Sequence, residues 1–179
     1  MSMRKLKTFA AAAAFAAGAA AAPAETPNLG TPISPADVAP WDISIQPDGS
    51  GLPPGSGNYA DGAKIFAAKC ALCHGADGKG APVSATPLVG GGPITDISAA
   101  SKTIANFWPY PTTLFDYIRR AMPWQQPMSL SDQEVYALTA YILASNKLIG
   151  ETDVIDARTL PQVRMPNRDG FIIRFPDLI

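Results

Sequence analysis

The sequence predicts an all-α domain of three main helices, with a long irregular arm before it and an irregular tail after it. Three segments carry apolar residues at helical spacing, at residues 58–70, 112–121 and 129–146. The centre of the chain lacks the alternation of apolar and polar residues that indicates strands, and it shows no internal repeat. The chain contains 15 Gly and 18 Pro in 179 residues, so we expect much of it to be irregular.

The first 24 residues have the three parts of a secretory signal peptide. Arg4, Lys5 and Lys7 form a positive start, an Ala- and Phe-rich run follows, and Ala22 and Ala24 fit the small-x-small rule for cleavage after Ala24. The alternative is a transmembrane anchor, but the apolar run is short and rich in alanine for crossing a bilayer. We therefore expect export and removal of residues 1–24.

Removal of this segment takes away three of the 14 basic residues and none of the 15 acidic ones, which leaves a net charge of −4. Because the basic footprint of a nucleic-acid-binding protein is missing, nucleic acid is excluded as a partner. Residues 25–61 carry five acidic and no basic residues, whereas residues 62–125 carry six basic and three acidic ones. The basic residues are candidates for a docking rim, with a solvated surface as the commoner alternative: Lys64, Lys69, Lys79, Lys102, Arg119 and Arg120.

Residues 25–57 are predicted to form an extended arm. The stretch 26–57 holds seven prolines and five glycines, which disfavour a regular helix or a central strand. Trp41, Ile43 and Ile45 alternate as if one edge were buried, which favours an arm strapped across a domain over a free linker.

The domain proper is predicted at residues 58–150. The first helix has an apolar stripe of Tyr59, Ala63, Phe66, Ala67 and Cys70. Residues 75–111 are predicted to form a long loop, and a loop of this length normally encloses something functional. The second helix buries Leu114, Phe115 and Ile118 and ends before Pro123. The third begins with a capping box of Ser131 and Glu134 and buries Val135, Leu138, Tyr141 and Ile142.

The tail, residues 151–179, is too apolar for a solvated terminus. Its apolar residues are Leu160, Val163, Met165, Phe171, Ile172, Ile173 and Phe175. We expect it to pack on the domain or on a partner subunit.

Residues 69–80, KCALCHGADGKG, contain the two cysteines and the one histidine of the chain. Cys70, Cys73 and His74 form the C-x-x-C-H pattern of c-type haem attachment. Two thiols one helical turn apart can each add to a vinyl group on one edge of the porphyrin, and the next residue then places an imidazole under the iron.

Three other interpretations of this motif are weaker. A zinc site needs four ligands, and the chain has no further Cys or His to complete one. A thioredoxin-like redox pair needs a βαβ setting, and a disulfide between Cys70 and Cys73 would enclose almost no loop. The motif therefore predicts one haem c attached through Cys70 and Cys73, with His74 as an iron ligand. In bacteria this attachment takes place outside the cytoplasm, so the motif and the signal peptide together predict the periplasm.

The second iron ligand is expected to be a methionine, because the sequence contains no second histidine that could take this position. Met1 and Met3 leave with the signal peptide, which leaves Met122, Met128 and Met165. Met122 stands where the second helix breaks at Met122-Pro123 and is the first choice, Met128 in the following loop is the alternative, and Met165 is interpreted as core packing. Methionine ligation raises the reduction potential and fills the coordination sphere, which suits electron transfer.

Residues 58–147 resemble a class I cytochrome c, with a first helix ending in CALCHG, a Gly/Pro loop, a helix ending in Met-Pro and a closing helix. The resemblance implies three helices around one covalent haem. It implies that Pro87 in TPLVGG, or alternatively Pro82, offers its carbonyl to His74. It also implies that Gly62 and Phe66 cross Tyr141. Trp108 and Tyr110 are candidate haem-propionate donors, with aromatic packing as the alternative.

Four further segments resemble the cytochrome subunit of sulfane dehydrogenase, the SoxD type, and the cytochrome partners of molybdenum sulfite dehydrogenases. These are PDGSGLPPGSG, FWPYPTTLFDYIRRAMPW, LSDQEVYALTAYIL and TLPQVRMPNRDGF. Fuller members of that family carry a second haem domain, whereas this sequence has one C-x-x-C-H. The resemblance implies single-electron transfer from a periplasmic molybdenum-dependent sulfur-compound dehydrogenase to another cytochrome or an oxidase, without catalysis by this chain.

Two other functions stay open at this point. A haem enzyme or gas sensor needs an open sixth position and a distal acid or base, for which Arg119 and Arg120 are the available anion-stabilising groups. An assembly role, in which arm and tail wrap a catalytic partner, is compatible with electron transfer.

Overall fold

The computed structural model of the chain describes residues 29–84, 87–98 and 101–172. The chain divides into two compact units, residues 1–41 and residues 42–179. The predicted signal peptide lies outside the described residues. Over the described ranges, no helix has both the length and the apolar character that a membrane span requires.

In the first unit, one short helix interrupts the predicted extended arm. Helix α2 spans Pro35–Val38 and starts with a capping box, in which the backbone and hydroxyl of Ser34 donate to the Asp37 carboxylate at 2.8 and 2.7 Å. The expectation that this stretch contains no helix is therefore wrong for one turn. Pro35 at the first helical position explains it, because its fixed φ is preorganised for a helix.

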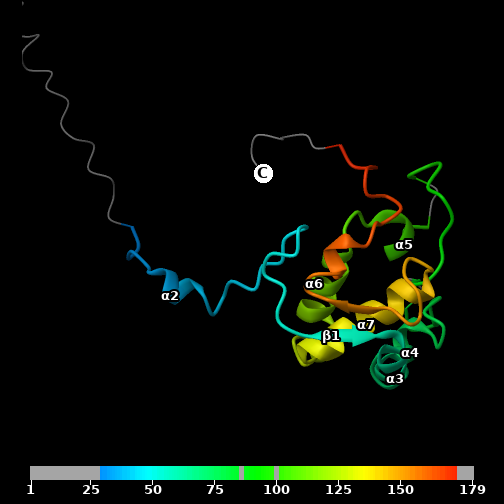
Figure 1. The fold of residues 1–179 in the computed structure, drawn as a ribbon, viewed down its shortest axis with the longest axis horizontal. Coiled ribbons are helices and arrows are strands. Elements are labelled where there is room, and N and C mark those ends of the chain that lie inside the picture. Colours follow the sequence, from blue (N-terminus) through cyan, green and yellow to red (C-terminus); the bar gives the residue numbers. More distant parts are fainter. Residues whose placement is uncertain (1–28, 85–86, 99–100, 173–179) are drawn as a thin grey trace, which may run out of the picture. The chain divides into compact units, whose positions relative to one another are not determined.

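The three predicted helices are present in the second unit. They are α3 at Tyr59–Lys69, α6 at Pro111–Ala121 and α7 at Asp132–Ser145. Both α3 and α6 pack against α7 (Figure 1). The predicted capping box of α7 is confirmed. The Glu134 amide donates to the Ser131 side chain, and the Ser131 amide donates to the Glu134 side chain.

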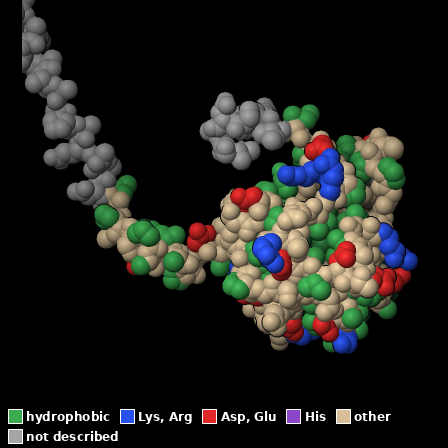
Figure 2. All heavy atoms as spheres, in the orientation of Figure 1, with side chains coloured by type: hydrophobic (Ala, Val, Ile, Leu, Met, Phe, Trp, Pro, Cys, Tyr) green, Lys and Arg blue, Asp and Glu red, His purple; other side chains and the backbone are tan. Residues whose placement is uncertain are grey.

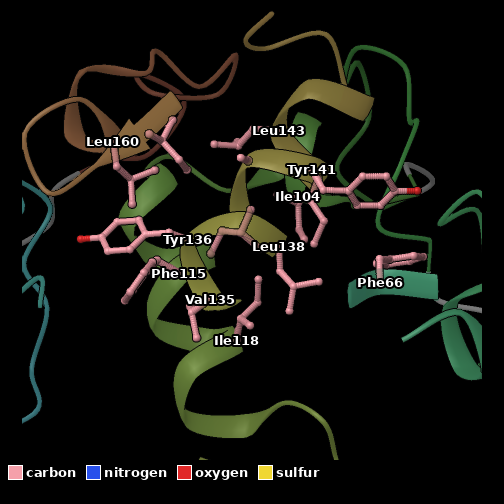
Figure 3. Packing of buried hydrophobic residues seen from close by; sticks show 14 of the residues in the cluster. Phe66, Ile104, Phe115, Ile118, Val135, Tyr136, Leu138, Tyr141, Leu143 and Leu160 are labelled. Carbon is pink, nitrogen blue, oxygen red and sulfur yellow. The ribbon is translucent and has the colours of Figure 1, made fainter. Parts of the chain in front are cut away.

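Helix α7 is the centre of the core and is buried more completely than its predicted stripe. Every residue from 135 to 144 is buried. A helix that is apolar all round belongs in a protein interior, because no face is left for water. In Figure 3, Val135, Leu138 and Tyr141 of α7 lie among Phe115 and Ile118 of α6 and Phe66 of α3.

The crossing of α3 and α7 depends on a glycine, as the resemblance to class I cytochromes c implied. A Cβ on Gly62 would stand 2.0 Å from the Ala137 carbonyl oxygen and 2.6 Å from the Tyr141 Cβ. One turn later, the rings of Phe66 and Tyr141 meet with centroids 4.8 Å apart. The expected contact of Gly62 and Phe66 with Tyr141 is confirmed.

Two short strands, which the sequence pattern did not predict, join the arm to the tail. Strand β1, Ser56–Asn58, pairs antiparallel with β2, Val154–Asp156, and Gly57 faces Ile155. The 3₁₀ helix η1, Leu160–Gln162, follows β2. Ile155, Leu160 and Met165 of the tail are buried and belong to the same core cluster as Tyr136 and Leu143, and Figure 3 labels Leu160 of this group. The described tail therefore packs on its own domain.

Residues 42–55 lie along the same domain. Ile45 and Leu52 pack against the core, the Tyr136 hydroxyl donates to the Pro53 carbonyl at 2.9 Å, and Arg120 donates to the Ile43 carbonyl at 2.7 Å. Trp41 does not continue the predicted buried edge, since 85% of its surface is exposed.

The predicted loop 75–111 contains local structure of its own. A short helix, α4 at Ala71–His74, precedes it, and another, α5 at Ile104–Phe107, lies within it. The Thr103 hydroxyl donates to the Gly90 carbonyl at 2.7 Å, and the Asn106 amide donates to the Gly92 carbonyl at 3.0 Å. These bonds connect the segment at residues 90–92 with the segment at residues 103–106.

Candidate cofactor site

The backbone between α3 and α4 places the two thiols one turn apart. The Cys70 amide donates to the Phe66 carbonyl at 2.9 Å and ends α3. Cys70 then serves as the N-cap of α4, and its carbonyl accepts the amides of Cys73 and His74 at 3.1 and 3.0 Å. This turn presents Cys70, Cys73 and His74 as one group, which matches the arrangement inferred from the motif.

Two adjoining cavities border this group. The first, of about 300 Å³, is lined by Cys70, Cys73, His74 and Met122. The second, of about 390 Å³, is lined by His74, Met122, Pro87 and Trp108. Their other walls are largely apolar and include Phe66, Leu88, Leu114, Ile118, Leu138 and Ile142. Since His74 and Met122 line both, the cavities meet at the two predicted iron ligands.

The residues present fit a covalent haem. The cavity volumes fall in the range of roughly 300–1,000 Å³ that holds cofactor-sized ligands. Cys70 and Cys73 are not joined by a disulfide, so both thiols remain available for addition. Burial raises the pKa of the Cys70 thiol to about 11, which keeps it protonated at neutral pH. A pair of thiols, an imidazole and a thioether around an apolar hollow form the donor set of haem c.

The three methionines occupy different environments. Met122 is the C-cap of α6, with its amide bonded to the Ile118 carbonyl at 3.1 Å, and it lines both cavities. Met128 is 63% exposed, has a φ of 61° and lines neither of these cavities. Met165 is fully buried in the hydrophobic core. Met122 is thus the one of the three that borders the site.

The remaining site residues inferred from the sequence are only partly brought together. Pro87 and Trp108 line the second cavity together with His74. Pro82 is exposed, and Tyr110 lines neither cavity. The Tyr110 ring instead lies under the Arg168 guanidinium, 4.1 Å from its centroid. The tail, rather than the cavity, contacts this tyrosine.

Two residues that support the site were not identified from the sequence. Trp124, directly after Met122-Pro123, lines both cavities while 78% of its surface is exposed. Asn146, at the end of α7, donates to the Leu88 carbonyl at 3.0 Å and accepts the Gly90 amide at 2.9 Å. Asn146 thereby fixes the loop that carries Pro87 and Leu88. Its only signal in the sequence was an asparagine at a predicted helix end.

The predicted basic rim is largely neutralised by neighbouring carboxylates. The ion pairs are Lys64–Asp61, Lys69–Glu134, Lys79–Asp77, Arg119–Asp132 and Arg120–Asp116. Lys102 lies over the Phe107 ring, 5.7 Å from its centroid. Figure 2 likewise shows basic and acidic groups side by side on the face in view. These six residues therefore do not form a uniformly positive collar.

Comparison with known proteins agrees with this site. Residues 59–146 match the family model for cytochrome c. Fold and site together define a class I cytochrome c domain, and the chain belongs to the cytochrome c family. A cytochrome c domain implies a covalently bound haem c and a role in electron transport.

Particular relatives narrow the family. One chain of the sulfane dehydrogenase SoxCD from Paracoccus pantotrophus is 38% identical, with a TM-score of 0.75 and coverage of 85% of this chain and 74% of that one. A thiosulfate dehydrogenase from Psychrobacter arcticus is 31% identical over 111 residues, which cover 55% of this chain and 31% of the relative. The match thus spans about a third of that relative's length. The chain is a cytochrome c related to the cytochrome subunits of sulfur-compound dehydrogenases.

Proposed function

We propose that this chain is a monohaem electron-transfer protein that receives single electrons from a sulfur-compound dehydrogenase and passes them to another cytochrome or an oxidase. The observation that carries the proposal is that His74 and Met122, from different elements, line the same two cavities beside Cys70 and Cys73. A centre ligated on both sides has no open iron position for a substrate or a gas. An electron carrier therefore fits this site better than a haem enzyme or sensor.

Each residue of the site has its own task in this proposal. Cys70 and Cys73 would hold the haem through thioether bonds, and His74 and Met122 would be the ligands of its iron. When bound, the haem supplies a one-electron redox centre. The Pro87 carbonyl would orient the His74 imidazole, and Trp108, which lines the second cavity while Tyr110 does not, would be the aromatic donor for a haem propionate. The apolar walls limit access of water, which tunes the reduction potential.

The sixth ligand is tested by visible and near-infrared spectra of the purified holo-protein. Met122→Ala should lose the weak methionine-to-iron charge-transfer band and acquire affinity for carbon monoxide, because the iron opens on that side. Met128→Ala is the matched control and should keep the wild-type spectrum, since Met128 is exposed and lines neither cavity. A wild-type protein that is high-spin and binds carbon monoxide would contradict the proposal and favour the enzyme or sensor.

The partners and the compartment belong to the same proposal. The similarity to a chain of the sulfane dehydrogenase SoxCD supports a sulfur-compound dehydrogenase as electron donor, and the sequence resemblance implies that this dehydrogenase depends on molybdenum. The signal-peptide pattern of residues 1–24 and the attachment of haem c outside the bacterial cytoplasm support the periplasm.

Reduction kinetics test whether the chain only carries electrons or itself catalyses the oxidation of a sulfur compound. Holo-protein mixed with thiosulfate or sulfite alone should stay oxidised, and it should become reduced when a catalytic amount of a sulfur-compound dehydrogenase is added. Sustained oxidation of thiosulfate by the chain alone, with an artificial acceptor, would overturn the carrier assignment and place the protein among the enzymes.

A further inference from the structure

One wall of the second cavity consists of a segment with little stability of its own. Lys102, Thr103, Ile104 and Trp108 line this cavity. They belong to or flank α5, which is a single turn of four residues. An isolated turn does not hold together in water, because helix nucleation is unfavourable and leaves terminal carbonyls without partners. The wall formed by residues 102–110 therefore depends on contacts from elsewhere in the chain.

The C-terminal tail supplies three such contacts. The Asn167 side-chain amide donates to the Phe107 carbonyl, the last of α5, at 2.7 Å. The Arg168 guanidinium lies over the Tyr110 ring, and the Phe171 ring meets the Phe107 ring edge-on at 5.4 Å. The three contacts come from residues 167–171, and the residues that they contact, Phe107 and Tyr110, lie before and after Trp108 in the sequence.

This part of the tail is itself held in place, by a buried side chain before it and by two backbone turns within it. Met165, two residues before Asn167, is fully buried in the core. The Arg168 amide donates to the Met165 carbonyl at 3.1 Å, and the Gly170 amide donates to the Asn167 carbonyl at 3.1 Å. A Cβ on Gly170 would stand 1.8 Å from the Asn167 side-chain oxygen, so a larger residue at position 170 would displace the Asn167 side chain.

We propose that residues 167–171 are a clasp that holds the wall at residues 102–110 against the cofactor, with Asn167 as the positioning residue. The clasp would limit access of water to the second cavity, which Trp108 lines, and so would contribute to the reduction potential of a haem bound there. The use of the clasp in electron transfer rests on the proposed function, but its effect on the wall does not.

Hydrogen–deuterium exchange of the full holo-protein tests the clasp directly. Asn167→Ala and Gly170→Ala should both speed amide exchange at residues 102–110, by about 2- to 10-fold for the loss of one hydrogen bond. Exchange in α7 should change less. Arg158→Ala is the matched control, because this tail side chain is exposed and its ion-pair partner, Asp156, lies in β2 and outside the clasp.

A second readout separates positioning from general loosening. In both variants the reduction potential should fall, because added water stabilises the oxidised, more positive iron, whereas Arg158→Ala should keep the wild-type potential. Unchanged exchange at residues 102–110, or equal acceleration in the wall and in α7, would overturn the clasp. A failed Met122 experiment with wall-specific exchange intact would instead contradict the ligand assignment alone.

Discussion

At the scale of single residues, Glu134 connects the start of α7 with the segment that carries the cysteines. One carboxylate oxygen accepts the Ser131 amide at 2.9 Å and completes the capping box. The other pairs with Lys69, the residue before Cys70. The hydrogen bond from Lys69 and then that from the Ser131 backbone lower the Glu134 pKa below its ordinary value of 4.5. The charged carboxylate is therefore favoured in the folded state.

Glu134→Gln can keep the capping box but loses the charge that pairs with Lys69, so it should lower the free energy of unfolding by about 0.2–1 kcal/mol at pH 7. Because folding lowers the pKa of Glu134, its contribution is complete above pH 4.5 and is lost as the carboxylate is protonated in the folded protein. The difference between wild type and variant should therefore shrink as the pH falls below 4.5. Urea unfolding of the two holo-proteins at a series of pH values measures this, and a pH-independent difference would contradict the role of the charge.

At the scale of elements, the approach of α3 to α7 sets the shape of the core behind the cysteines. Gly62→Ala should cost about 1–3 kcal/mol or more, because the added methyl meets the Ala137 carbonyl and the Tyr141 Cβ, which can only move with the helices. Gly92→Ala is the matched control, since a Cβ there meets nothing within 4 Å, and it should stay within about 0.5 kcal/mol of wild type. Equal midpoints for the two variants in chemical unfolding would refute the close crossing.

The elements that were predictable are those that local sequence encodes. The stripe of α6 and the Ser131–Glu134 box lie within a few residues, so their periodicity and capping chemistry are visible in the sequence. The pairing of β1 with β2 joins Gly57 to Ile155 in three-residue strands, too short for an alternating pattern to emerge. Helix α5 is likewise hidden, because one turn inside a Gly/Pro-rich loop has no periodicity.

The residues of the candidate site likewise fall into those that local sequence reveals and those that only the fold brings together. Cys70, Cys73 and His74 lie within five consecutive residues, so the chain itself displays their chemistry. Asn146 and Asn167 act on carbonyls 58 and 60 residues away, and such contacts leave no local pattern. Tyr110 shows the same limit, because its candidate role at the cofactor was inferred without knowledge of the tail, and in the structure the Arg168 guanidinium of the tail lies over its ring.

At the scale of the whole molecule, the segments on either side of the cytochrome core complete it. Residues 42–58 bond to Arg120 and Tyr136, while Ile155, Leu160 and Met165 of the tail fill the core beside α7. Deletion of residues 151–179 would therefore expose the core and also remove the clasp. Loss of a partner after such a truncation would report unfolding as readily as a missing interface, so point substitutions are the better test.

Leu160→Ala should lower the free energy of unfolding by about 2–5 kcal/mol, because Leu160 is fully buried and its loss leaves a cavity in the core. Ile172→Ala is the matched control from the same tail, since 95% of Ile172 is exposed, and it should change stability by no more than about 0.5 kcal/mol. Urea unfolding of the holo-proteins, followed by far-ultraviolet circular dichroism, measures both. If Leu160→Ala were as stable as Ile172→Ala, the tail would be an appendage of the domain, and its apolar residues would have to be explained by a partner subunit instead.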